Sequence, residues 1–113
     1  MITREKIKEN FFKETTEYGK AISIGDHKKA NKNHKKIQIL YNQAKEMNII
    51  DVFSELLNEP DENVRLWAAT FTLKIFPALA EKSLNELSGL SSITGLSAET
   101  TLHLWKEGKL YLL

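Results

Sequence analysis

The sequence predicts an all-α protein that folds as a single domain over residues 1–113. Apolar residues recur at three- and four-residue spacing through most of the chain, which is typical of amphipathic helices. Only two prolines and five glycines are present, too few for a sheet with many tight turns. A hydrophobic content of 42% over 113 residues is enough to form one core and too little for two.

The first half of the chain predicts two long helices. Thr3 can cap a helix that ends near Ile24, and Gly25 supplies the stop. Asp26 can cap a second helix that runs to about Met47. Its first half, HKKANKNHKK, is almost wholly polar. The apolar stripes of the two helices are Ile7, Phe11, Tyr18 and Ile22, and then Ala30, His34, Ile37, Leu40 or Tyr41, and Ala44.

The centre of the chain predicts a helical hairpin. One helix spans Ile49 to Leu57 and stops at Asn58-Glu59-Pro60, because a residue before proline avoids helical angles. Asp61 can cap the next helix, Glu62 to Phe76, by accepting hydrogen bonds from the free amides of its first turn. We expect this helix to bury Val64, Ala68, Phe71 or Thr72, and Ile75.

The last third predicts another pair of helices. Pro77 is acceptable at a first helical position and can open a helix from Ala78 to about Leu87. We expect Leu79, Leu84 and Leu87 to point inward. The run SGLSSITGLS predicts a loop of small residues, after which Ser97 caps a helix from Ala98 to Glu107 that ends at Gly108.

The central hairpin carries a resemblance to a known repeat. Asp61, Val64-Arg65, Ala68-Ala69 and Leu73 stand in the order found in a HEAT repeat. Further along, Leu84 and Leu87 are followed by the pattern LSAExxLxxWKxG over residues 96–108. This run is similar to a family of small bacterial HEAT/armadillo-like helical domains of unknown function. The resemblance implies a right-handed stack of about three helical hairpins, an α-solenoid, in which Asp61 and Arg65 tie one repeat to the next.

Charge is unevenly distributed along the chain. The formal net charge is only +1, yet residues 1–47 hold eleven Lys and Arg against six Asp and Glu, a net +5. The remaining residues hold five against nine, a net −4. Such a division steers charged partners more than it determines a fold.

The motifs of catalysis and cofactor binding are missing. The chain has no cysteine, no glycine-rich phosphate loop, no GxSxG and no HExxH. His27 and His34 lack a third zinc ligand, and His103 with Glu99 predicts a surface ion pair. We therefore expect no catalytic residue, no metal and no cofactor. No apolar signal core or membrane-length segment is present, so we expect a cytoplasmic protein that does not enter a membrane.

Two functions remain. The first is a protein-binding module, because short stacks of helical hairpins present a continuous surface. Small bacterial proteins of this type resemble immunity proteins, which cover a cognate toxin, for example a nuclease. A basic toxin would bind an acidic face made of Asp51, Glu55, Glu59 and Glu62.

The alternative is a nucleic-acid-binding module that uses the lysine-rich second helix to contact phosphates. The sequence leaves the oligomeric state open. The lysines of this alternative are Lys28, Lys29, Lys32, Lys35 and Lys36.

Overall fold

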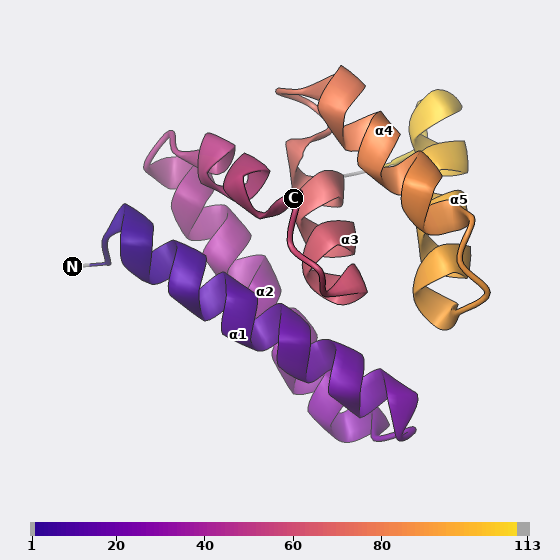
Figure 1. Cartoon of the computed structure of the whole chain (residues 1–113). Coiled ribbons are helices and arrows are strands. Elements are labelled where there is room, and N and C mark those ends of the chain that lie inside the picture. The colour runs from indigo at the N-terminus through magenta and orange to yellow at the C-terminus, as the bar shows by residue number, and fades with distance from the viewer. Residues whose placement is uncertain (1, 111–113) are drawn as a thin grey trace.

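The computed structural model describes residues 2–110, which form five α-helices and one 3-10 helix without a β-strand. The all-helical prediction is therefore confirmed. Helix α3 lies between two pairs of helices, α1 with α2 on one side and α4 with α5 on the other (Figure 1). In chain order the elements are α1 (Arg4–Ser23), α2 (His27–Glu46), η1 (Ile50–Leu56), α3 (Glu62–Thr72), α4 (Pro77–Ser88) and α5 (Ile93–Lys106).

These elements close into one compact body. The radius of gyration is 13.1 Å and the principal extents are 39 × 32 × 25 Å. A compact domain of about 100 residues has a radius of gyration of about 13 Å, so the packing is that of an ordinary globular domain. No helix within residues 2–110 has both the length and the apolar character needed to cross a membrane.

Three predicted helix caps are present. The Thr3 hydroxyl accepts a hydrogen bond from the Lys6 amide at 3.1 Å, and the Asp26 carboxylate accepts one from the Lys29 amide at 3.1 Å. Asp61 accepts from two amides of the first turn of α3. Because each cap satisfies amides that have no partner inside the helix, these residues set where α1, α2 and α3 begin.

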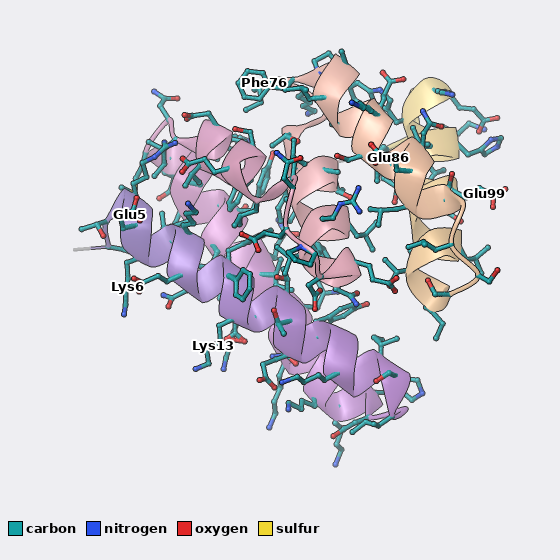
Figure 2. The ribbon with its side chains drawn as sticks, in the orientation of Figure 1. Glu5, Lys6, Lys13, Phe76, Glu86 and Glu99 are labelled. Atoms are coloured by element: carbon teal, nitrogen blue, oxygen red, sulfur yellow. The ribbon has the colours of Figure 1, made fainter. Side chains whose placement is uncertain are left out.

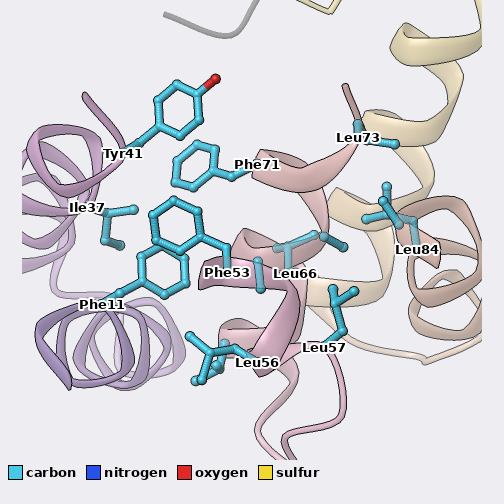
Figure 3. Packing of buried hydrophobic residues seen from close by; sticks show 14 of the residues in the cluster. Phe11, Ile37, Tyr41, Phe53, Leu56, Leu57, Leu66, Phe71, Leu73 and Leu84 are labelled. Carbon is cyan, nitrogen blue, oxygen red and sulfur yellow. The ribbon is translucent and has the colours of Figure 1, made fainter. Parts of the chain in front are cut away.

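Aromatic rings join the first four elements into one core. Phe11 of α1 packs on Phe53 of η1 with ring centroids 4.5 Å apart, and Tyr41 of α2 stacks on Phe71 of α3 at 4.3 Å (Figure 3). All four side chains are buried. The core continues from α3 into α4 and α5 through Leu73, Leu84, Leu87, Ala98 and Leu102.

The predicted helix Ile49 to Leu57 differs from the structure in type. Residues Ile50–Leu56 form a 3-10 helix, directly after a turn at Asn48 with φ 58°. The segment lies between this turn and the hinge that ends at Pro60, and short connecting segments often adopt the tighter 3-10 winding. The apolar side still faces the core, since Val52, Phe53 and Leu56 are buried.

Two inward positions were predicted wrongly. Helix α3 ends at Thr72, four residues before the predicted end, so Ile75 lies in the turn before α4 and is 41% exposed. Leu79 of α4 is 55% exposed. Pro77 is the first residue of α4, as expected. Because proline cannot continue the hydrogen-bond pattern of α3, the apolar spacing of α3 does not extend past it.

The predicted start of the last helix is also wrong. Helix α5 begins at Ile93, and its cap is Ser92, whose hydroxyl accepts a hydrogen bond from the Gly95 amide at 3.1 Å. Ser97 lies inside the helix. Gly95 is buried where an added Cβ would lie 2.1 Å from the Leu90 carbonyl oxygen. The small residues that predicted a loop instead allow the start of α5 to pack closely against the backbone at Leu90.

Candidate functional site

A groove of about 210 Å³ lies between the C-terminal half of α1, the outer side of α3 and the start of α5. Each helix contributes residues that repeat at helical spacing, so three stripes meet at this place. We call this feature the α1–α3–α5 groove. It is lined by Tyr18 and Ile22 from α1, by Asn63, Leu66, Trp67 and Thr70 from α3, and by Ile93, Thr94, Ser97 and Thr101 from α5.

Trp67 is the largest side chain of the groove and connects it to the core. Its ring lies edge-on to Tyr18 at 5.3 Å, with an interplanar angle of 89°, and 5.1 Å from His34 of α2. It also contacts Phe71 at 5.8 Å. Packing on several sides fixes the indole, so the groove wall is rigid where Trp67 forms it.

The polar groups of Tyr18 and Trp67 are partly shielded from water. Burial raises the pKa of the Tyr18 phenol, so the hydroxyl remains protonated and can donate a hydrogen bond. The Trp67 Nε1–H is buried and finds no acceptor among residues 2–110. The Trp67 side chain as a whole is half-buried, at the wall of the groove.

Among residues 2–110, none of the side chains that line the groove is charged. Its polar lining consists of hydroxyl groups and one amide, from Tyr18, Asn63, Thr70, Thr94, Ser97 and Thr101. Such groups can donate and accept hydrogen bonds, but they do not compensate a buried charge. The site is therefore suited to an uncharged apolar group flanked by hydrogen-bonding atoms.

An exposed apolar ridge borders the groove. Leu90, Ile93 and Leu96 are 41%, 61% and 65% exposed. Ile93 lines both the groove and a neighbouring shallow hollow that contains Leu90, Leu96 and Glu99. Figure 2 shows Glu99 projecting outward from α5. We call these three aliphatic residues the Ile93 ridge.

The predicted acidic face is divided by ion pairs with α1. The Arg4 guanidinium lies 3.1 Å from Asp51 and also pairs with Glu55, while Lys8 Nζ lies 3.1 Å from Glu55. Hydrogen bonds from Arg4 and Lys8 hold the pKa of the Glu55 carboxyl below its ordinary value. Asp51 and Glu55 are therefore largely neutralised within the molecule.

The other two predicted carboxylates lie apart from this pair. Glu59 lines a second hollow of about 390 Å³ beside Arg65, Lys82 and Glu86. Arg65 Nη2 lies 3.5 Å from the Glu86 carboxylate, which Figure 2 shows on α4. Glu62 is half-buried in the first turn of α3. The four carboxylates thus lie in three different environments. Their spacing in the sequence could not show this, because the neighbouring residues come from distant parts of the chain.

The lysine-rich start of α2 is also divided. Lys29 pairs with Glu17 at 2.9 Å and Lys36 approaches Glu14 at 3.9 Å, so two of the five lysines face acids of α1. The exposed residues Lys28, Lys32 and Lys35 form no ion pair within residues 2–110. Their spacing places them on one side of the helix.

His103 and Trp105 each contact a glutamate side chain. The His103 Nε2 atom lies 3.4 Å from the carboxylate of Glu107, which is one helical turn further along α5. The prediction that His103 pairs with Glu99 is therefore wrong. Trp105 Nε1 donates to Glu81 at 3.4 Å. Within residues 2–110 no group of three or more His, Asp or Glu side chains could hold a metal ion.

The groove was missed in the sequence analysis because its third wall was assigned to a loop. On the α3 wall, Leu66 and Trp67 add an apolar strip beside the buried side of the helix, and this strip is the signal in the sequence that could have pointed to the groove. A helix beginning at Ile93 could have been recognised only from the cap at Ser92, which competed with the many other serines in that segment.

Comparison with known proteins supports the fold alone. No protein-family model and no curated protein sequence matches the chain. The crystal structure of protein RPA1889 from Rhodopseudomonas palustris CGA009 is similar, with a TM-score of 0.91, and the alignment covers 98% of this chain and 94% of that chain. The two sequences are 21% identical. A second protein of nearly the same length therefore has the same fold.

Proposed function

We propose that this protein is a non-catalytic module that binds another protein, and that the α1–α3–α5 groove with the Ile93 ridge is its binding surface. The observation that carries the proposal is the junction of Trp67 and Tyr18 in an uncharged groove with an exposed aliphatic ridge. Tryptophan and tyrosine dominate the binding energy of protein interfaces. Exposed apolar groups that adjoin such anchors mark interaction sites more often than isolated exposed residues do.

The chemistry of the groove supports a binding role over catalysis. Its aliphatic hydroxyl groups come from Thr70, Thr94, Ser97 and Thr101, and among residues 2–110 its lining includes no histidine, lysine or carboxylate that could act as their base. A hydroxyl nucleophile without a neighbouring base is weak. The same lining can still form hydrogen bonds with the backbone of a partner.

We also propose that the helices form a HEAT-like stack. Successive elements contact one another in chain order from α3 to α5, and α1 packs along α2. Arg65 of α3 reaches Glu86 of α4, a contact of the kind that the resemblance assigns to the repeat's arginine. Asp61 serves as the cap of α3. A stack of this kind would leave the outer sides of its helices free for a partner.

More specifically, we propose that the protein binds and neutralises a toxin in the cytoplasm, as the sequence suggested. In that form, basic groups of the toxin would bind Glu59 and Glu62 directly. To reach Asp51 and Glu55 they would have to replace Arg4 and Lys8, which already occupy these carboxylates. The acidic contribution is therefore smaller than the spacing of the four residues suggested.

Site-specific photo-crosslinking in cells of the source organism tests the proposal. A photoreactive residue at Ile93 is expected to give one discrete adduct with another protein. The matched control is Ile39, an isoleucine of α2 that is 55% exposed and lies in a separate hollow beside Lys13 and Lys36. Absence of an adduct at position 93, or the same set of adducts at both positions, would overturn the proposal.

A further inference from the structure

We infer that the α1–α3–α5 groove receives a single large, uncharged apolar side chain from the partner, while the partner's surrounding surface covers the Ile93 ridge. This inference rests on the proposed function and names the chemistry of the group that occupies its site. Three properties of the groove support it: its size, its lack of charge and its position beside the ridge.

The volume restricts what can enter. Sites for small molecules and cofactors usually enclose about 300–1,000 Å³. The groove offers about 210 Å³ and opens to the surface, where Ile93 is 61% exposed. That space suits one protruding side chain attached to a larger body outside the groove. A protein that presents such a side chain fits this requirement.

The lining selects an uncharged group. A charged side chain that enters this groove would lose water without gaining an opposite charge, since no charged residue of the described part of the chain lines it. Such desolvation without a compensating charge strongly disfavours binding of an ion. The second hollow contrasts with it, because Glu59, Arg65, Lys82 and Glu86 all line that site. Charge thus distinguishes the groove from the other concave surface beside α3.

The position of Ile93 links the groove to the ridge. Ile93 contributes to both features, so a partner that inserts a side chain beside Trp67 must also come into contact with Ile93. Leu90 and Leu96 then extend the apolar contact to the far side of Ile93. The hydroxyl groups of Ser97 and Thr101 can bond to partner backbone atoms at the groove edge. An anchor in a groove surrounded by apolar contacts is the usual arrangement of an interface hot spot.

Small probes that reproduce a side chain test this inference without knowledge of the partner. The full chain is labelled with ¹⁵N and titrated with isobutanol, which mimics leucine, and separately with the charged analogues isobutylammonium and isobutyrate. We expect isobutanol to shift the Trp67 indole signal and the amides of residues 93–101 in a saturable manner. The charged analogues are expected to bind there at least about ten-fold more weakly, a difference of about 1.4 kcal/mol.

Two variants control the titration. Ser97→Phe fills the groove from a half-exposed position and should abolish the saturable shifts. Ile39→Lys alters the separate exposed hollow and should leave them unchanged. If Ser97→Phe does not fold, Thr101→Phe provides a second filling variant from the next turn of α5. Equal binding of charged and uncharged probes, or shifts outside the groove, would overturn the inference.

Self-association is a further contradictory outcome. Groove signals that shift with protein concentration in the absence of any probe would mean that a second copy of this chain occupies the groove. A photo-adduct at position 93 without saturable probe binding would retain the proposed function and reject the single-anchor mechanism. Probe binding without an adduct would reject the proposed function and retain the chemistry of the groove.

Discussion

The guanidinium of Arg4 lies 3.1 Å from the carboxylate of Asp51, although the two residues stand 47 positions apart in the sequence. Arg4 also pairs with Glu55, to which Lys8 adds a second cation. The basic start of the chain thus neutralises carboxylates that the sequence analysis assigned to a partner. The network fastens η1 to α1.

Arg4→Ala should destabilise the protein by about 0.5–1 kcal/mol at pH 7, because exposed ion pairs stabilise little even in a network. Glu55 has a lowered pKa in the folded state, so its contribution is present above the ordinary glutamate pKa of about 4.3. That contribution is lost as the pH falls through the lowered value. The difference between Arg4→Ala and the parent in urea unfolding should therefore shrink in acid.

Lys6→Ala provides the control for this ion-pair network. Lys6 pairs with Glu9 of the same helix at 3.7 Å, so its removal leaves the contact between α1 and η1 intact. We expect a smaller change in the free energy of unfolding than for Arg4→Ala. Equal effects of the two variants at pH 7 would show that the Arg4 network does not stabilise the fold.

Ser92→Ala should lower stability by about 1 kcal/mol, the usual cost of losing a helix N-cap. The Ser92 hydroxyl accepts from the Gly95 amide at 3.1 Å. Ser97→Ala, at the cap position predicted from the sequence, should change stability by less than about 0.5 kcal/mol. Thermal unfolding of both variants measures the difference, and a larger loss for Ser97→Ala would contradict the observed start of α5.

Gly95→Ala should destabilise the protein by about 2–4 kcal/mol, because the added methyl meets rigid backbone. An ideal Cβ at Gly95 lies 2.1 Å from the Leu90 carbonyl oxygen. Gly89 is the matched control, since a Cβ there lies 3.5 Å from the Glu86 carbonyl oxygen, an ordinary contact. Chemical unfolding that ranks Gly89→Ala as the more damaging change would show that α5 does not approach Leu90 so closely.

The lysine-rich helix should contribute little to nucleic-acid binding. Of the five lysines at the start of α2, three (Lys28, Lys32 and Lys35) form no ion pair within residues 2–110, and three phosphate contacts give a salt slope of only about −2.7. We expect association with a generic duplex at physiological salt to be weaker than about 100 μM. Micromolar binding that is lost in Lys28→Gln/Lys32→Gln/Lys35→Gln, but kept in Lys29→Gln/Lys36→Gln, would favour the nucleic-acid alternative.

The sequence was sufficient to predict what local rules determine. The helical class followed from spacing, and the caps at Thr3, Asp26 and Asp61 were predicted because each precedes an apolar period. The start of α5 was missed because tertiary packing of Gly95 against Leu90 overrides the weak helical preference of the segment.

The candidate site was harder to predict, because it depends on contacts between distant segments. Four carboxylates close together in the sequence suggested one acidic face, but Arg4 and Lys8 approach two of them from another helix. Conversely, Tyr18, Trp67 and Ile93 are far apart in the sequence and meet at the groove. Their individual residue types indicated only an apolar stripe.

The affinity of the partner captured at position 93 for two lysine variants tests the central claim most directly. Ile93→Lys places a charge on the ridge beside the uncharged groove, whereas Ile39→Lys places the same charge on the separate hollow of α2. Binding is measured by calorimetry, and the helical spectra of both variants must be unchanged. We predict that Ile93→Lys lowers the affinity at least about 30-fold, or about 2 kcal/mol. We predict less than about a two-fold change for Ile39→Lys. Unchanged affinity in Ile93→Lys, with binding lost in Glu59→Lys/Glu62→Lys instead, would contradict the account and assign the partner to the acidic residues.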